Sequence, residues 1–204
     1  NYLLRLGWSL GDDEIFSGED MKKGFNSGIL NKSPATFSMD KLLWFNKYYL
    51  DQMSIDQLME VVALQHFDGS EYSKTVMETI RDRCSTLNEF STNADYFFKD
   101  PEDYDPSLLI KHCKEYTFNH LSLLKEQLEA LEIWEQTYIK EVIDSVVSDL
   151  DIGFGKIGLP LRLALTATVN SPSIDLVCEI LGKEITLRRL ENFLTKIKNL
   201  KTDQ

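Results

Sequence analysis

The stretch Leu159–Thr166 reads LPLRLALT, and a polar turn with a proline, Ser171–Asp175, follows it within a few residues. Apolar residues recur at helical spacing on both sides of that turn. This spacing predicts one short helix from about residue 156 to 166 and another from about 173 to 181. Gly182 then separates the second helix from a last one. Short helices joined by tight turns indicate helix-on-helix packing rather than a sheet.

Arg162 is the single charged residue in the first stretch, and its neighbours are mostly apolar. A buried or half-buried arginine needs acceptors for its fork of N–H donors, and an RNA base or phosphate is one such acceptor. The alternative is that Arg162 reaches toward solvent or pairs with a local carboxylate. The pattern indicates a candidate site without assigning it a function.

Helical patterns continue over most of the chain. Ser38 and the serine of Ser54–Gln57 are typical helix N-caps, and Thr86 can cap another helix. Val76 and its apolar neighbours predict a helix that includes Arg83 and ends in the turn that begins at Cys84. No segment beyond the N-terminal region alternates with the period of a strand. The predicted fold class is all-α, a helical bundle.

The strongest break in the chain is Asp100–Pro106, with two prolines and four acidic residues, and we expect a mobile, solvated linker there. Two long amphipathic helices should follow it. We predict a compact N-terminal piece over residues 1–52 and a helical array over 53–204, with a possible subdivision near residue 135. The chain begins without a methionine or a basic leader, so we expect a piece of a longer protein.

The formal net charge of the 204 residues is -11, which argues against non-specific binding to nucleic acid. The charge is unevenly placed, however. Residues 95–151 hold 5 basic and 14 acidic side chains, whereas residues 152–204 hold 8 basic and 5 acidic ones. A polyanion could therefore be repelled by the middle of the chain and attracted by its last third. Alternatively, both segments are ordinary solvated helix faces.

Catalytic, metal and membrane signatures are absent from the sequence. The three cysteines are far apart and the three histidines are scattered, so neither a disulfide framework nor a metal site is predicted, and we expect reduced thiols in the cytoplasm. Gly153–Gly155 follows a helix and lacks the third glycine of a phosphate loop. No apolar run approaches the length of a membrane span. We predict no cofactor for this chain and expect a monomer.

Three groups of motifs resemble the C-terminal part of bacterial-type glutamyl-tRNA synthetases. Their order and spacing match the family over essentially the whole chain. The first group is Leu4–Ser17 with Asn31–Ala35 and Asp40–Asn46, the second is Arg81–Phe90, and the third is Leu159–Thr166 with the Ser171–Pro172 turn and Leu181–Glu184.

The resemblance implies that residues 1–52 are the C-terminal part of the stem-contact region and that residues 53–204 are the α-helical anticodon-binding domain. The partner that the resemblance implies for this chain is tRNA-Glu, held by the anticodon. The family's nucleotide-binding signatures lie upstream of these regions and are missing here. These signatures belong to the family's catalytic domain, which would bind ATP, Mg and glutamate. This chain alone should therefore not form glutamyl adenylate. The alternative is a helical interaction or regulatory module derived from the family.

The resemblance also implies roles for individual residues. Arg83 matches the arginine that reads the last anticodon base, and Arg162 matches a second anticodon-contacting arginine. The loop that packs against splayed bases includes Ser171, Pro172 and Ile174, where backbone contacts are better supported than side-chain contacts. Ser9 and Lys41 lie in stretches similar to the segment that contacts the tRNA stem.

Overall fold

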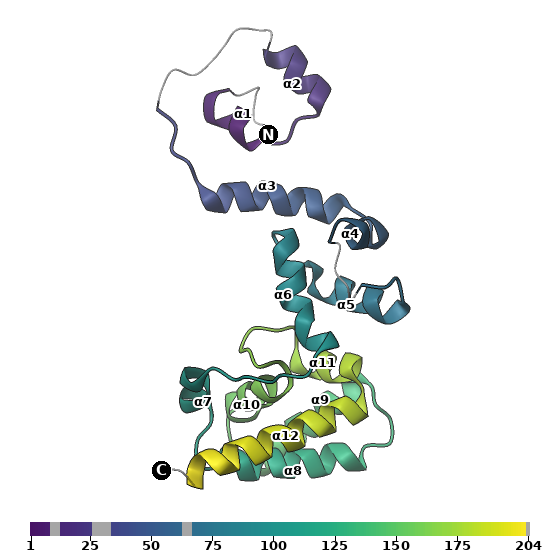
Figure 1. The fold of residues 1–204 in the computed structure, drawn as a ribbon, viewed down its shortest axis with the longest axis vertical. Coiled ribbons are helices and arrows are strands. Elements are labelled where there is room, and N and C mark those ends of the chain that lie inside the picture. The colour runs from purple at the N-terminus through teal and green to yellow at the C-terminus, as the bar shows by residue number, and fades with distance from the viewer. Residues whose placement is uncertain (9–12, 26–33, 63–66, 203–204) are drawn as a thin grey trace.

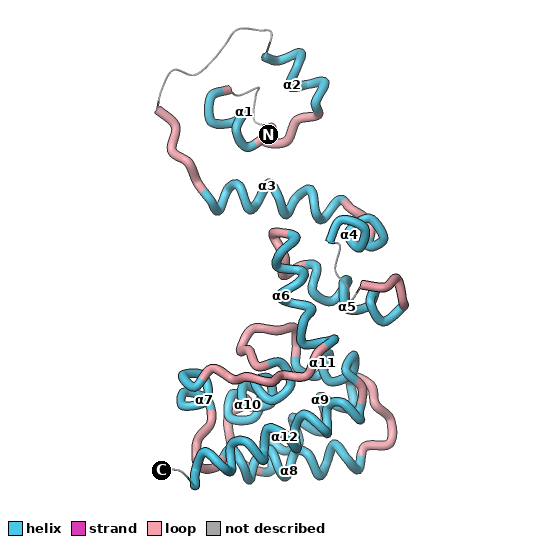
Figure 2. Tube along the Cα trace, in the orientation of Figure 1, coloured by secondary structure: helices cyan, strands magenta, loops and turns pink. Residues whose placement is uncertain are grey.

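A computed structural model describes residues 1–8, 13–25, 34–62 and 67–202. Within these ranges the chain forms twelve α-helices and no strand, which confirms the all-α prediction (Figures 1 and 2). The helices are α1 (Tyr2–Gly7), α2 (Gly18–Phe25), α3 (Met39–Gln52), α4 (Ile55–Val62), α5 (Glu71–Arg81), α6 (Leu87–Phe98), α7 (Pro106–His112), α8 (Thr117–Ala130), α9 (Gln136–Asp149), α10 (Gly155–Thr166), α11 (Ile174–Leu181) and α12 (Lys183–Thr202).

The predicted N-caps are confirmed. The Ser38 hydroxyl accepts a hydrogen bond from the Lys41 backbone N–H at 3.3 Å, and the Thr86 hydroxyl accepts one from Glu89 at 3.3 Å. Ser54 and Gln57 form a reciprocal capping box, with bonds of 2.8 Å and 3.2 Å. These side chains satisfy backbone donors that a helix start leaves without partners, and so they define where α3, α4 and α6 begin.

Two details differ from the prediction. Arg83 lies in the turn after α5 rather than in the helix, because α5 ends at Arg81 and Asp82 is its C-cap. The short helix α7 was not predicted after the acidic break. It begins at Pro106, whose fixed φ suits a first helical turn, and the Asp105 carboxylate caps it by accepting from the Ser107 N–H at 2.8 Å.

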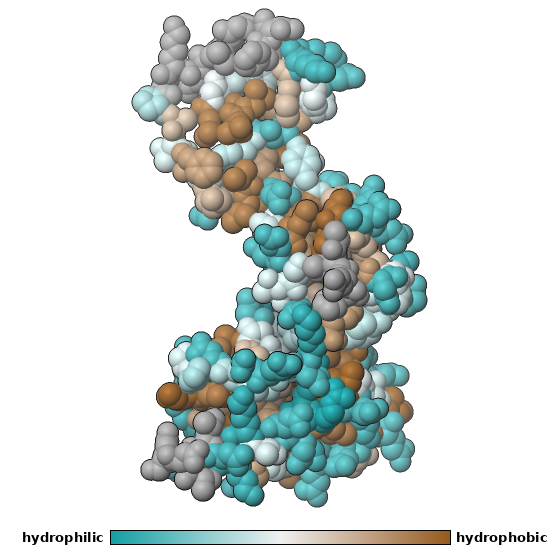
Figure 3. All heavy atoms as spheres, in the orientation of Figure 1, coloured by the Kyte–Doolittle hydropathy of each residue, from teal (hydrophilic) through white to brown (hydrophobic). Residues whose placement is uncertain are grey.

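The helices form three tiers along the long axis of the molecule (Figure 1). One end holds α1 and α2, the middle holds α3 to α6, and the other end holds α7 to α12. Hydrophilic residues cover much of the last tier on the face shown in Figure 3, over α8 and α12. No helix in the described ranges has both the length and the hydropathy that crossing a bilayer requires.

One apolar core runs through the middle and last tiers. Its buried side chains extend from Leu50 at the end of α3 to Ile197 in α12, and Phe90, Leu121 and Phe193 are among those with no exposed surface. A separate set of buried aromatic rings, Tyr2, Trp8 and Phe16 of the first tier with Phe45 of α3, lies outside this core.

The acidic segment after α6 is anchored, contrary to the expected mobile linker. The carboxylate of Asp100 accepts hydrogen bonds from Arg188 at 2.8 Å and from Nε of Arg189 at 2.9 Å. Tyr104 packs its ring against Phe193, with the centroids 5.1 Å apart. The sequence showed the charges and the prolines of this segment, but not the two arginines of α12 that hold it.

Candidate nucleic-acid interface

Arg83 is exposed in the tight turn between α5 and α6. Its neighbour Cys84 is fully buried and donates a hydrogen bond from its thiol to the Ile80 carbonyl at 3.3 Å. Burial raises the pKa of the Cys84 thiol to about 11, so Cys84 packs as a neutral apolar group. Because Cys84 points into the core, the turn leaves the guanidinium of Arg83 at the surface.

Two side chains, Arg81 at the end of α5 and Asn46 of α3, attach this turn to α3. Arg81 donates from one nitrogen, Nη2, to the carbonyls of Leu50, Asp51 and Met53 at 3.1, 2.7 and 2.6 Å. A cation there satisfies carbonyls that the C-terminal end of a helix leaves free. Asn46 donates to the Ser85 carbonyl at 2.6 Å. The end of α3 therefore supports the turn that carries Arg83.

Arg162 holds the loop between α10 and α11. Its Nη1 donates to the Ser171 carbonyl at 2.8 Å and also contacts the Ser171 hydroxyl and the Pro172 carbonyl. The acceptors are loop atoms rather than a local carboxylate. Other donors of the Arg162 fork have no acceptor among the described residues, so one side of the guanidinium organises the loop and the rest stays available.

Arg83 and Arg162 bind consecutive residues of this loop. Arg83 donates from Nη1 to the Asn170 side-chain oxygen at 3.0 Å, although the two residues are 87 positions apart, and Arg162 binds the adjacent Ser171. Half-burial lowers the pKa of Arg162, and the charge of Arg83 lowers it further. Burial raises the pKa of Tyr96, against the influence of both arginines. The two cations therefore lie within each other's electrostatic reach, next to one buried tyrosine.

These two arginines have no carboxylate partner among the described residues, in contrast to most of the chain's other arginines. Arg5 pairs with Glu14, and both Arg188 and Arg189 pair with Asp100. Asp175 influences the pKa of Arg162 without forming an ion pair with it. In a chain with a net charge of -11, two neighbouring cations without an ion-pair partner are an arrangement suited to an anionic ligand.

The other predicted loop residues are mostly covered. Ser171 is 5% exposed, Pro172 is buried, and Ile174, the first residue of α11, is 1% exposed. The Ile174 side chain lies in the core and supports the loop from beneath. Contact between this loop and a splayed base would thus use the backbone and the exposed Val169 and Asn170 more than these three side chains.

Of the two predicted stem-contact residues, Lys41 is described by the structure and is not brought to this site. Ser9 lies outside the described residues. Lys41 is in the first turn of α3, where its ammonium pairs with Glu14 at 3.1 Å. That end of α3 faces the first tier rather than the loop (Figure 1).

Sequence reasoning missed three residues that build the site: Asn170, Arg81 and Arg189. Arg189 is 3% exposed and donates to the carbonyls of Tyr96 and Leu165, each at 2.7 Å. It thereby joins α6 to α10 at Tyr96, the residue whose pKa both Arg83 and Arg162 influence. The position of Asn170 just before the Ser171–Pro172 turn was the one signal that could have drawn attention to it.

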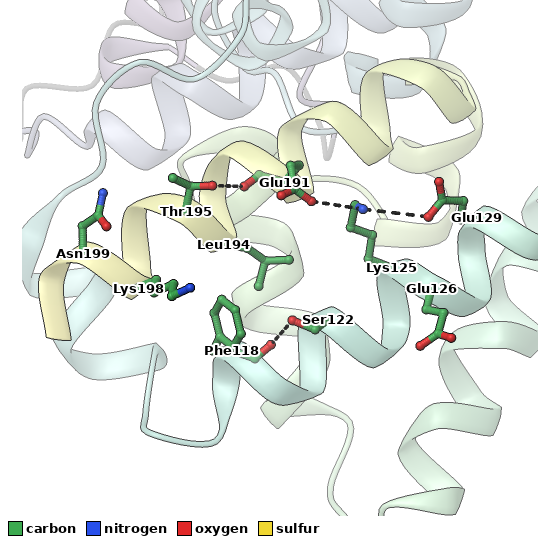
Figure 4. A pocket seen from close by; sticks show the side chains of 10 residues that line it. All are labelled: Phe118, Ser122, Lys125, Glu126, Glu129, Glu191, Leu194, Thr195, Lys198 and Asn199. Atoms are coloured by element: carbon green, nitrogen blue, oxygen red, sulfur yellow. Dashed lines mark hydrogen bonds and ion pairs between the residues drawn. The ribbon is translucent and has the colours of Figure 1, made fainter. Parts of the chain in front are cut away.

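Two hollows lie in the last two tiers. One, of about 550 Å³, borders the Asn170 loop and is rich in carboxylates, including Asp95, Asp100 and Asp103. The other, of about 420 Å³, lies between α8 and α12 (Figure 4). Its central cation, Lys125, is already paired with Glu191 at 3.0 Å and lies 3.8 Å from Glu129. We therefore place the candidate site at the two unpaired arginines rather than in either hollow.

Known proteins match this chain in sequence pattern and in structure. The model of the family described as "Anticodon binding domain" matches residues 49–194. A glutamate tRNA ligase from Elizabethkingia meningosepticum, whose crystal structure contains its amino acid, is 27% identical, with a TM-score of 0.79 over 95% of this chain. A glutamate-tRNA synthetase from Elizabethkingia anophelis is 26% identical, with a TM-score of 0.76 over 95% of this chain.

The match covers only part of each relative: this chain spans 40% of the first structure and 39% of the second. The family match, in contrast, covers most of the present chain and includes α4 to α11 with both unpaired arginines. The chain therefore belongs to the anticodon binding domain family.

Proposed function

We propose that this chain recognises the anticodon of tRNA-Glu as the C-terminal part of a glutamate-tRNA ligase. The observation that carries the proposal is the pair of arginines without carboxylate partners, Arg83 and Arg162, on consecutive residues of one loop. The likeness to two glutamate-tRNA ligases over 95% of the chain supports the choice of tRNA.

The chemistry of an arginine suits the last anticodon base. Arg83 would read that base, at which glutamate and glutamine tRNAs differ. The planar fork of an exposed arginine can donate two hydrogen bonds to the acceptor edge of a cytosine. Guanine at the same place offers a different edge and a larger ring. By analogy with readout in DNA grooves, such a contact discriminates between bases by about 1–3 kcal/mol.

The acidic character of the chain is compatible with this function. Anticodon loops are read as splayed single-stranded bases, which need directed local contacts rather than a broad basic face. The carboxylates around the neighbouring hollow would repel phosphates that approach from that side. The bound loop would then be oriented by attraction to Arg83 and Arg162 and by repulsion beside them.

The catalytic step would belong to the rest of the ligase. We infer that ATP, Mg and glutamate bind to a catalytic domain outside these residues, and that the present chain alone does not aminoacylate tRNA. We also infer a monomer in the cytoplasm, where its tRNA partner is found.

Titration with tRNA-Glu and tRNA-Gln transcripts at two salt concentrations tests the proposal. The wild-type chain should prefer tRNA-Glu, and binding should weaken as salt rises. Arg83→Gln should reduce the preference. Lys140→Gln removes an equal charge from an exposed position of α9 and should preserve the preference. If the wild-type chain binds neither tRNA, the proposal is wrong and the helical interaction module becomes the better reading.

A further inference from the structure

The side chain of Arg83 makes one hydrogen bond within the described residues, to the amide oxygen of Asn170 at 3.0 Å. Both residues are exposed. A long exposed arginine samples many rotamers, and fixing it costs up to about 2 kcal/mol of conformational free energy. A partner that restricts the guanidinium before RNA arrives would lower that cost at the moment of binding.

The backbone of Asn170 is itself held on both sides. The Thr168 hydroxyl accepts from the Asn170 N–H at 3.1 Å, and the Thr166 hydroxyl accepts from the Thr168 N–H at 3.3 Å. The next residue, Ser171, is bound by Arg162. The amide of Asn170 is therefore presented from an anchored backbone, although its side chain is at the surface.

An amide differs from a carboxylate in a way that matters here. Its oxygen accepts a hydrogen bond without adding a negative charge. The hollow beside Asn170 already holds several carboxylates, among them Asp95 and Asp103. A carboxylate at position 170 would neutralise Arg83, whereas the amide orients the guanidinium and leaves its charge available to a base or a phosphate.

We propose that Asn170 is a positioning residue that aims the guanidinium of Arg83 at the anticodon base through the Arg83 Nη1 to Asn170 Oδ1 hydrogen bond. The proposal deepens the function given above and rests on it. One N–H of Nη1 is taken by Asn170, which leaves the Nη2 and Nε edge of Arg83 as the fork that faces the base. Asn170 thus contributes to specificity through Arg83.

Two substitutions at position 170 test this role with different readouts. Asn170→Ala removes the acceptor but keeps the charge of Arg83, so the preference for tRNA-Glu over tRNA-Gln should fall roughly five- to tenfold, with an unchanged salt dependence. Asn170→Asp keeps the acceptor and neutralises Arg83. It should weaken binding of both tRNAs and reduce the slope of log affinity against log salt by about 0.7. Asn88→Ala, at an exposed asparagine of α6, is the matched control and should change neither quantity.

A double-mutant cycle separates this proposal from the function on which it rests. In an Arg83→Ala background, Asn170→Ala should cause no further loss of preference. An unchanged preference in Asn170→Ala, or an additional loss in the double variant, would overturn the positioning role while anticodon recognition stands. Absence of any preference in the wild-type chain would instead overturn anticodon recognition itself.

Discussion

The first tier and the helical array are built from different kinds of core. In the first tier and where it meets α3, buried aromatic rings pack edge to face, with Trp8 and Phe16 centroids 5.3 Å apart and Tyr2 and Phe45 centroids 6.1 Å apart. The array has a continuous core, largely aliphatic, that draws on α3 to α12. The two cores share no buried residue among those described, since Tyr2, Trp8, Phe16 and Phe45 all lie outside the large one.

This difference distinguishes the helices that support the site from the tier that is only attached to them. The turn of Arg83 and the Asn170 loop are both carried by helices of the large core, so the geometry of the arginine pair depends on the array. The first tier is connected to it through α3, which accepts hydrogen bonds from Arg81 of α5 and donates one from Asn46 to Ser85. We therefore expect the array to keep its site when the first tier is perturbed.

The largest expected effect comes from the large core. Phe193 has no exposed surface, and Phe193→Ala should reduce the free energy of unfolding by about 3–5 kcal/mol through lost burial and a new cavity. Urea denaturation measures it. Phe45→Ala, in the aromatic core where α3 meets the first tier, is the comparison and should leave the main transition nearly unchanged. Equal losses from both variants would show that the two cores unfold as one unit.

A smaller effect should follow from breaking the clamp on the acidic segment. Asp100→Asn leaves Arg189, which is 3% exposed, without its counter-charge. The free energy of unfolding should fall by about 2 kcal/mol. This value lies between those typical of exposed and of buried ion pairs, because the Asp100 side chain is itself 42% exposed. Asp103→Asn, at an exposed position of the same segment, is the control in denaturant titrations.

The same ion pair predicts a pH dependence. Partial burial opposes ionisation of Asp100, but hydrogen bonds from Arg189 and Arg188 outweigh it, so its pKa lies below the ordinary value of 3.8. A carboxyl with a lowered pKa in the folded state stabilises the fold above its unfolded pKa of about 4, and the contribution is lost as the pH falls through the folded pKa. Asp100→Asn should therefore lose less stability than the wild type on acidification. An identical pH profile for both proteins would contradict this assignment.

The polar contacts that attach α3 should contribute less to the free energy of unfolding than either core does. Arg81→Gln removes a cation that bonds three carbonyls at the end of α3, and the expected loss is about 1–2 kcal/mol. Hydrogen exchange should speed up in α3 and remain unchanged in α8. Asp82→Asn, at the exposed neighbouring position, serves as control. Faster exchange in α8 as well would mean that the array depends on α3 more than the contacts suggest.

The smallest expected effect concerns the start of the loop that Arg83 and Arg162 bind. Ala167 has φ 54°, in the left-handed region that glycine adopts without strain. Ala167→Gly should raise stability by about 0.5 kcal/mol, since relief of strain outweighs the greater freedom of glycine in the unfolded chain. Thermal unfolding measures it. A lower melting temperature would show that the surrounding contacts compensate this conformation.

Local features of the sequence predicted the helices well. The caps at Ser38, Ser54 and Thr86 act on residues three positions away, so their effect can be read from adjacent letters. The short helix α7 was missed because two prolines and several acids look like a linker, although one proline at a first helical position favours a helix.

The site itself depends on contacts that no local pattern contains. Arg83 and Asn170 meet across 87 positions, and Arg189 contacts Tyr96 across 93. The resemblance to a known family pointed to Arg83 and Arg162, but not to what holds them. Asp100 illustrates the same limit, because its partners are two arginines 88 and 89 positions further along the chain.

Short RNA hairpins can test whether Arg83 reads the last anticodon base. Two anticodon stem-loops of tRNA-Glu that differ only at that base, C or G, are titrated against the wild-type chain and Arg83→Gln. We expect the wild type to favour C by about 1–3 kcal/mol, and Arg83→Gln to abolish this difference while still binding both hairpins. The claim would be contradicted if the wild type bound C and G hairpins equally, or if Arg83→Gln kept the full preference.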